Sequence, residues 1–322
     1  MKAIRFAEPG GPEVLKFVDV ELPAPGSGEV RVRHTAIGVN YIDTYHRSGL
    51  YKLPLPSGLG SEAAGVVEAI GPGVSDLEAG DRVAYAGTLG SYAQANNVPA
   101  ARLIKLPSTL SDEVAAAALL KGMTAQYLLK RTFRVQPGQT ILFHAAAGGV
   151  GLIACQWAKH LGAIVIGTVG SDEKVSLARE SGCAHVLNTV SADWVKRVRE
   201  ITNGEGVPVV YDSIGKDTWS GSLDCLAVRG MMVSFGNASG AVPAFEPGIL
   251  SAKGSLYLTR PTLMHYTRTS EELQQTADDL FAVLAKGIVK VQVRQRFRLS
   301  EARAAHEALH SRRTIGATVL IP

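Results

Sequence analysis

The sequence predicts an α/β protein with one β-rich domain and one doubly wound, parallel-sheet domain. Up to about Pro107, short alternating apolar runs are interrupted by Gly and Pro, which is typical of strands joined by turns. From about Ser108, strand and helix patterns alternate, and this order builds βαβ units on a sheet covered on both faces. The length of 322 residues and the 46% hydrophobic content suit two domains with a sizeable core.

The β-rich part begins with a clear alternation. Glu29 to His34 reads EVRVRH, with the valines on one face of the predicted strand and the arginines on the other. Further strands are predicted at 65–70 and 82–84, separated by turns at 71–74 and 78–81. We therefore expect this part to be all or mostly β.

The second part alternates strands and helices, and the tail is mixed. After helical patterns at 114–120 and 125–129, strands are predicted at 140–144, 164–169, 185–188, 207–212, 231–235 and 256–258. The helices between them are predicted at 149–161, from a cap at Ser171 to an end at Gly182, after Ser191, and at 216–228. The tail is expected to hold a helix at 271–286 capped by Ser270, a basic strand at 294–298 that is a solvated face, a helix after Ser300 and a strand at 317–321.

Charge and composition exclude several classes. A formal charge of +4 and a pI near 8.9 are too weakly basic to indicate nucleic-acid binding. Cys155, Cys183 and Cys225 are too far apart in the sequence to suggest a metal site or a redox pair, and an odd number of cysteines gives no disulfide framework. We therefore expect a cytoplasmic protein. The start shows no signal peptide, and glycines interrupt the one apolar stretch, 140–158, that approaches membrane-spanning length.

The strongest motif is the segment AAAGGVG at 145–151, between a predicted strand and helix. It matches the dinucleotide fingerprint with Ala146 in place of the first glycine. Gly148 allows the backbone to approach a pyrophosphate and Gly151 allows close packing of helix and strand. The helix N-terminus then offers free N–H groups to the anion. A simple turn is the alternative, but the strand and helix around the loop favour a cofactor site.

The second strand of this series indicates which cofactor binds. NAD sites usually carry Asp or Glu about 20 residues past the loop. Here Ser171 follows the strand, Asp172 comes slightly late, and Lys174 and Arg179 follow. A hydroxyl and a cation suit a 2′-phosphate, so we predict NADPH; the alternative is that Lys174 and Arg179 are an ordinary solvated helix face.

Four segments together resemble the NADPH:quinone oxidoreductases, zinc-free relatives of zeta-crystallin among the medium-chain dehydrogenase/reductases. They are NYID at 40–43, GLGSEAAG at 58–65, AAAGGVG, and SFGN at 234–237. The resemblance covers the whole chain and is nearest the bacterial enzymes. It implies a GroES-like domain at 1–122 and 259–322, a Rossmann domain at 123–258, cofactor and quinone in the cleft between them, and a homodimer.

The same comparison implies that no zinc is bound. Zinc-dependent relatives have Gly-His-Glu where this chain has Gly60-Ser61-Glu62, a Cys ligand near the position of Asn40, and a four-cysteine lobe. Here no cysteine precedes Cys155. An alcohol dehydrogenase needs a Lewis acid, whereas a quinone is already a strong acceptor and needs mainly orientation. Its reduced oxygens can take protons from water or from hydroxyl groups.

The resemblance also implies which residues bind the cofactor. The nicotinamide end is expected at Asn40, Ile42, Asp43 and Thr44, with Lys121 and Thr124 nearby; the pyrophosphate at Gly148, Gly149 and Val150; the 2′-phosphate at Ser171, Lys174 and Arg312; and the remaining groove at Ser213, Phe235, Asn237, Ser239, Leu258 and Arg260. Bacterial relatives have Tyr at the place of Thr189, which puts one adenosine-phosphate contact in doubt.

The sequence allows two interpretations of the role of several residues. Asp43 is either a turn residue or a cofactor contact. Together with Asn40, Tyr45 and Tyr51 are candidates for the substrate pocket, where a ring and a hydroxyl suit a quinone, or they are ordinary packing residues. His144 fits a structural role better than that of an acid.

The leading function is hydride transfer from NADPH to small quinones. A reductase of enone or alkenal double bonds is the alternative enzyme. A nucleotide-loaded binding protein, like the crystallin or RNA-binding relatives, is a third reading, although the sequence supplies no RNA-binding module.

Overall fold

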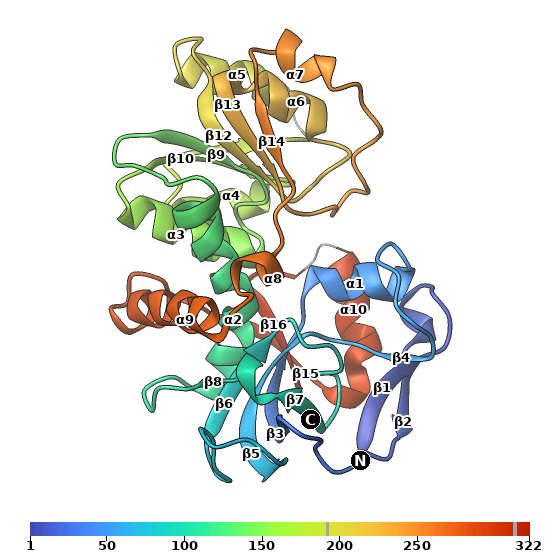
Figure 1. The fold of residues 1–322 in the computed structure, drawn as a ribbon. Helices are drawn as coiled ribbons and strands as arrows, with labels where there is room; N and C mark the ends of the chain where they lie inside the picture. The colour runs from blue at the N-terminus through green and yellow to red at the C-terminus, as the bar shows by residue number, and fades with distance from the viewer. Residues whose placement is uncertain (191–192, 312–313) are drawn as a thin grey trace. The chain divides into compact units, whose positions relative to one another are not determined.

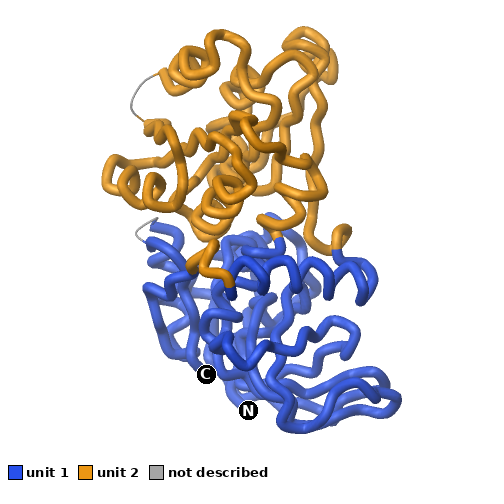
Figure 2. The backbone as a smooth tube through the Cα atoms, turned by 90° about the vertical axis from the view of Figure 1, so that its left-hand side faces the viewer, with its two compact units in different colours: residues 1–123, 267–285, 291–322 blue, residues 124–266, 286–290 orange. Residues whose placement is uncertain are grey.

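The β-rich and the α/β parts of the sequence fold around separate sheets. The computed structural model describes residues 1–190, 193–311 and 314–322. Unit 1 comprises 1–123, 267–285 and 291–322, and unit 2 comprises 124–266 and 286–290 (Figure 2). The sequence predicts boundaries after 122 and 258. The second differs because Tyr266, at the end of that stretch, stacks on Tyr127 within unit 2, with ring centroids 4.4 Å apart.

Unit 2 contains a six-stranded parallel sheet in the order β11-β10-β9-β12-β13-β14 (Figure 1). Counted along the chain, this is the doubly wound order 3-2-1-4-5-6, whose switch point lies between β9 and β12. The predicted parallel sheet is confirmed. The strands are β9 (Thr140–Phe143), β10 (Ile164–Val169), β11 (His185–Asn188), β12 (Val207–Asp212), β13 (Leu226–Ser234) and β14 (Tyr257–Thr259).

The helices around this sheet follow the prediction only in part, because the helices Gly248–Ala252 and Leu263–Tyr266 were not predicted. They are α3 (Gly149–His160), α4 (Val175–Glu180), α5 (Trp194–Ile201), α6 (Trp219–Asp224), α7 (Gly248–Ala252) and α8 (Leu263–Tyr266). The predicted helix at 216–228 is too long, because Leu226 pairs with Val207 and begins β13. The two helical patterns at 114–129 form one helix, α2 (Asp112–Tyr127), which continues into a π-helix at Leu128–Thr132. Ser191 lies outside the described residues.

The apolar stretch at 140–158 divides between β9 and α3. In the part of the chain that the structure describes, no helix has both the length and the hydropathy needed to cross a bilayer.

Unit 1 contains a seven-stranded sheet in which β15-β16-β3-β5-β6-β8 are neighbours and β7 pairs with β3, and a small sheet of order β2-β1-β4. The strands are β1 (Lys2–Phe6), β2 (Lys16–Asp19), β3 (Glu29–Gly38), β4 (Ser57–Gly58), β5 (Glu62–Ile70), β6 (Arg82–Ala86), β7 (Ala95–Pro99), β8 (Ile104–Lys105), β15 (Val293–Arg298) and β16 (Ala317–Ile321). The helices in the tail are α9 (Ser270–Ala285) and α10 (Ala302–His310). The expected cap of α9 is wrong, because the hydroxyl of Thr269 accepts the N–H of Glu272.

A helix that the sequence reading missed lies inside the β-rich part. α1 (Tyr41–Ser48) begins after Asn40, whose backbone N–H donates to the carboxylate of Asp43 at 2.8 Å. It ends at Gly49, which has a left-handed φ of 81°. Asp43 is therefore in the first turn of a helix and not in an isolated turn, and the carboxylate satisfies one end of the helix.

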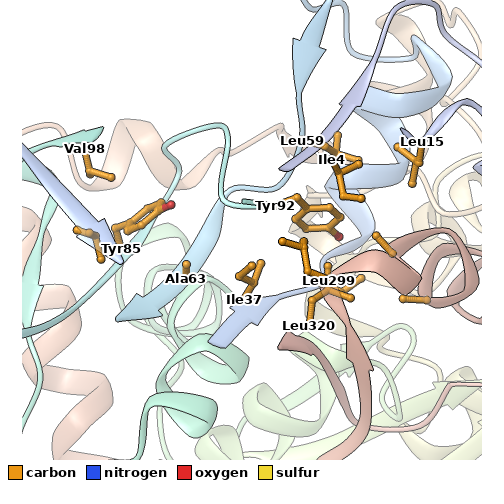
Figure 3. Packing of buried hydrophobic residues seen from close by; sticks show 14 of the residues in the cluster. Ile4, Leu15, Ile37, Leu59, Ala63, Tyr85, Tyr92, Val98, Leu299 and Leu320 are labelled. Atoms are coloured by element: carbon orange, nitrogen blue, oxygen red, sulfur yellow. The ribbon is translucent and has the colours of Figure 1, made fainter. Parts of the chain in front are cut away.

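The core of unit 1 is formed by strands and by residues from both ends of the chain. Figure 3 shows Ile4 and Leu59 near the ring of Tyr92, with Leu299 and Leu320 from the tail close by. Burial of these side chains requires the C-terminal segment to pack on the N-terminal strands, which explains why unit 1 is discontinuous in sequence.

Candidate functional site

The segment between β9 and α3 forms the tight turn that the fingerprint predicts. The N–H of Ala146 donates to the carbonyl of Thr168 on β10 at 2.8 Å, and the N–H of Gly148 donates to the carbonyl of Ala145 at 2.8 Å. Gly148 is the N-cap of α3, and Leu152 is the first residue after the turn whose N–H returns to Gly148. The first-turn amides before Leu152 are thus directed out of the helix end, at the switch point of the sheet.

Two positions in this turn require glycine, each for a different physical reason. A Cβ on Gly151 would lie 2.2 Å from the carbonyl oxygen of Ala145, so this position must lack a side chain for helix and strand to pack. A Cβ on Gly148 would lie 3.1 Å from the same oxygen, while Gly148, Gly149 and Val150 are each half-buried. A bare backbone with outward N–H groups at a helix N-terminus fits a pyrophosphate.

A buried hydrogen-bond network lies next to this turn and joins neighbouring strands of the sheet. Nδ1 of His144 lies 2.8 Å from Oγ1 of Thr168, and its Nε2 lies 3.0 Å from Oγ of Ser222, which donates to Asp212 at 2.8 Å. Burial lowers the pKa of His144. Because the Ser222 proton goes to Asp212, Nε2 of His144 must carry the proton that Ser222 accepts, and Thr168 donates to Nδ1. A neutral His144 therefore joins the ends of β9, β10 and β12.

The end of β10 presents the residues predicted for the adenosine phosphate. Ser171 precedes a 3-10 turn over Asp172–Lys174, and its hydroxyl makes no capping bond to that turn, contrary to the predicted cap. The carboxylate of Asp172 accepts from the Asn188 amide at 2.8 Å. The hydroxyl of Thr189 donates to the carbonyl of Val169. Ser171 and Lys174 are half-buried, and Arg312 lies outside the described residues.

The loops after β12 and β13 bring together most of the remaining predicted groove. Arg260 donates to the Ser234 hydroxyl at 3.0 Å and to the Gly236 carbonyl at 2.9 Å, and its other terminal nitrogen lies 3.1 Å from the Asn237 amide group. Backbone bonds join this loop to the one after β12. The predicted residues on these loops are Ser213, which accepts from Ala238; Phe235, which packs on Phe143; and Ser239, which bonds Ile214. Leu258 lies on β14.

In unit 1, a second cluster surrounds the carboxylate of Glu62. Asn40 donates its side-chain amide to Glu62 at 2.7 Å, Lys121 donates its ammonium at 3.2 Å, and the backbone N–H of Leu120 donates at 2.7 Å. The Glu62 and Lys121 side chains are 0% and 8% exposed. A Cβ on Gly38 would lie 2.2 Å from this carboxylate, so the strand glycine makes room for it. Thr124, the first residue of unit 2, is buried on the same helix as Lys121.

Asp43 lies beside this cluster and is fully buried. It accepts hydrogen bonds from the backbone of Asn40 at 2.8 Å and from the hydroxyl of Tyr92 at 3.0 Å. Burial raises the pKa of Asp43 to about 7, against the lowering effect of these two donors. The carboxyl of Asp43 therefore titrates near neutral pH.

Tyr45 in α1 and Tyr51 just after α1, both predicted for the substrate pocket, form an aromatic cluster with Tyr41. The rings of Tyr45 and Tyr51 meet edge to face at 5.2 Å, and Tyr41 meets Tyr45 at 5.7 Å. Ile42 is half-buried, and Thr44 donates its hydroxyl to the carbonyl of Tyr41.

Sequence reasoning missed several members of the cluster. Glu62 could have been found, since it ends the Gly-Ser-Glu motif. Tyr92, which bonds Asp43, and His306, which bonds Tyr92, carried no signal, because they come from segments distant from α1 and meet it only in the folded unit.

Comparisons with known proteins agree with this arrangement. Residues 26–108 match the alcohol dehydrogenase GroES-like domain, and residues 149–282 match the zinc-binding dehydrogenase family. A quinone oxidoreductase of Pseudomonas aeruginosa is 56% identical over 100% of this chain and 99% of its own. A 2-haloacrylate reductase of a Burkholderia species is 49% identical over 97% of this chain and 96% of its own.

Among solved structures, the Escherichia coli quinone oxidoreductase complexed with NADPH matches with a TM-score of 0.99 and 52% identity, covering 100% of both chains. Identity of this extent over whole chains exceeds what a shared fold alone would give. The chain therefore belongs to the quinone oxidoreductases of the medium-chain dehydrogenase/reductase family.

Proposed function

We propose that this protein is an NADPH-dependent quinone oxidoreductase that reduces small quinones. The observation that carries the proposal is the glycine turn before α3, whose backbone leaves room and N–H groups for a pyrophosphate at the switch point of the sheet. The relatives named above support both the nucleotide and the acceptor.

The residues present fit NADPH. Gly148, Gly149 and Val150 would hold the pyrophosphate through backbone N–H groups, and Ser171 with Lys174 would hold the 2′-phosphate. Asp172 is bonded to Asn188, which favours the phosphorylated ribose over the ribose diol. When bound, NADPH supplies the hydride. The role of the protein is then to orient the two reactants.

Other predicted contacts belong to this proposal. The loop held by Arg260, Asn237 and Phe235 would line the groove, and Asn40, Ile42, Asp43, Thr44, Lys121 and Thr124 would meet the nicotinamide end. Tyr45 and Tyr51 would form an apolar wall for the quinone ring, because each offers a ring face and a hydroxyl.

We also propose that the reaction uses no zinc. Asn40 and Ser61 stand where zinc-dependent relatives have metal ligands, and Asn40 is bonded to Glu62. Among the described residues, the structure gathers no group of three His, Cys, Asp or Glu that could hold an ion. Elemental analysis of the purified protein tests this directly.

We further propose a homodimer in the cytoplasm. Strand β14 is an edge strand of the sheet in unit 2. Tyr257 on β14 is 59% exposed, and Val228 on the neighbouring β13 is 75% exposed. An edge strand with exposed apolar side chains suits pairing with a second copy. The three cysteines are free and buried, as expected in a reducing compartment.

A double-bond reductase is the second candidate, because the 2-haloacrylate reductase is so similar. Steady-state kcat/KM with NADPH separates the two. We expect a small para-quinone to be reduced with at least a tenfold higher kcat/KM than an alkenal or a 2-haloacrylate, which is roughly 1.4 kcal/mol of discrimination. A reversed preference would favour the second candidate.

A further inference from the structure

The two buried carboxyl groups of unit 1 have opposite surroundings. Glu62 accepts from three donors, and one of them is the ammonium of Lys121. Asp43 accepts from neutral groups, and among the described residues no ammonium or guanidinium contacts it. Glu62 is therefore held by an ion pair, whereas Asp43 has only neutral donors and its carboxyl is able to carry a proton.

A chain of hydrogen bonds fixes one oxygen of Asp43. Nη1 of Arg47 lies 3.0 Å from Nδ1 of His306, and Arg47 can only donate, so Nδ1 accepts and Nε2 carries the proton of the neutral ring. Nε2 of His306 then donates to the hydroxyl of Tyr92 at 3.0 Å, and Tyr92 donates onward to Oδ2 of Asp43. Burial and the adjacent Arg47 charge lower the pKa of His306 to about 3, which keeps this ring neutral.

The donor-to-acceptor direction of these hydrogen bonds decides which oxygen of Asp43 can be protonated. Oδ2 already accepts two hydrogen bonds, from the hydroxyl of Tyr92 and from the backbone N–H of Asn40. A proton on Oδ2 would therefore point at the hydrogen of a donor and not at an acceptor. A proton must therefore sit on Oδ1. The neighbour of Oδ1 is the hydroxyl of Ser61, with the two oxygens 3.5 Å apart.

We propose that Asp43 stores the proton that the reduced quinone takes up and that Ser61 transfers it. The proposal rests on the proposed function. Hydride from NADPH converts a quinone to the hydroquinone monoanion. Its phenolate oxygen takes the Ser61 hydroxyl proton while Ser61 takes the proton from Oδ1 of Asp43. Water reprotonates Asp43 after product leaves, so NADPH, one proton and quinone give NADP⁺ and hydroquinone.

Neighbouring titratable groups are poorer sources. Burial and the adjacent Asp43 raise the pKa of Tyr92 well above its ordinary value, and its proton is committed to Oδ2. Lys121 is paired with Glu62. Of the nearby charges, Lys121 lowers and Glu62 raises the pKa of Asp43, but burial is the largest influence and keeps the carboxyl protonated up to about pH 7.

The first test replaces the proton store. Asp43→Asn keeps the size of the side chain, and Ser61→Ala removes the transferring hydroxyl. With NADPH and a para-quinone, we expect each variant to lose about 100-fold in kcat. The wild-type kcat should fall as pH rises through about 7, and this step should be absent in Asp43→Asn. Near wild-type kcat in Asp43→Asn, with the pH step retained, would overturn the proposal.

A second pair of variants guards against a folding defect. Tyr92→Phe removes one donor from the Asp43 carboxylate and should move the pH midpoint upward by roughly one unit. Tyr85→Phe is the matched control, since Tyr85 is equally buried and bonds a histidine, His34, outside this cluster. Equal midpoints in both variants would contradict the role of Asp43.

Infrared spectroscopy supplies a readout without turnover. The wild-type protein at about pH 6 should show the C=O stretch of a protonated carboxyl that Asp43→Asn lacks. If the wild type does not reduce quinones at all, the proposed function fails. If it does and the band is absent, only the proton store fails.

Discussion

Replacement of Asp43 by Asn should make the free energy of unfolding less dependent on pH. The carboxyl has a pKa of about 7 in the folded chain because it is buried, against an ordinary value of 3.8. Between these values the folded state binds one more proton than the unfolded state. Stability from this group is therefore fully present below pH 3.8 and is lost as pH rises through about 7.

The magnitude follows from the distance between the two pKa values. Roughly three units at about 1.4 kcal/mol each give a loss on the order of 4 kcal/mol across the whole window. From about pH 5 to about pH 8 the loss is roughly 2–3 kcal/mol, nearly all of it below pH 7. Because Asp43 is fully buried, solvent screening does not reduce this figure.

The assay is urea unfolding of wild type and Asp43→Asn at several pH values in that range. The difference in unfolding free energy, variant minus wild type, should rise with pH and level off above about pH 7. Other titrating groups, including the histidines, cancel in this difference. A difference that stays constant, or that falls as pH rises, would refute the assignment of the raised pKa to Asp43.

Three further predictions concern unit 2. Lys174→Ala should raise the KM for NADPH roughly tenfold or more, through loss of a charge-assisted contact, and leave the KM for NADH nearly unchanged; equal effects would argue against a 2′-phosphate site. Gly148→Val should weaken NADPH binding, measured by calorimetry, while its urea unfolding midpoint stays nearly normal. Gly151→Val places a Cβ 2.2 Å from a carbonyl oxygen and should lose roughly 1–3 kcal/mol of unfolding free energy. The reverse pattern would contradict the roles given to the two glycines. Tyr257→Lys should shift sedimentation from dimer to monomer, and an unchanged dimer would exclude this edge.

The nucleotide-binding unit was largely predictable because its signals are local. Buried parallel strands appear as continuous apolar runs, and α3 shows its apolar face at helical spacing. The glycine turn lies within a few residues of both elements, so its geometry follows from sequence alone. The end of the helix before β13 was missed because Leu226 has helical spacing from Leu223 but is buried as a strand residue.

The cluster around Asp43 was only partly predictable. Asp43 and Asn40 lie in a recognisable motif, but helix α1 has eight residues and sits between strand patterns, so periodicity did not reveal it. Tyr92 and His306 come from segments 49 and 263 residues from Asp43 in the sequence, and only the packing of the tail on the first strands brings them together. Long-range burial of this kind has no local signature.

The decisive experiment is the stoichiometry of turnover. Purified protein is mixed with NADPH and a small para-quinone under anaerobic conditions, and both NADPH oxidation and hydroquinone formation are followed. We expect one hydroquinone per NADPH, and we expect Gly148→Val to be slower because its KM for NADPH is higher. Absence of any pyridine-nucleotide binding, or NADPH oxidation without hydroquinone, would contradict the proposed function.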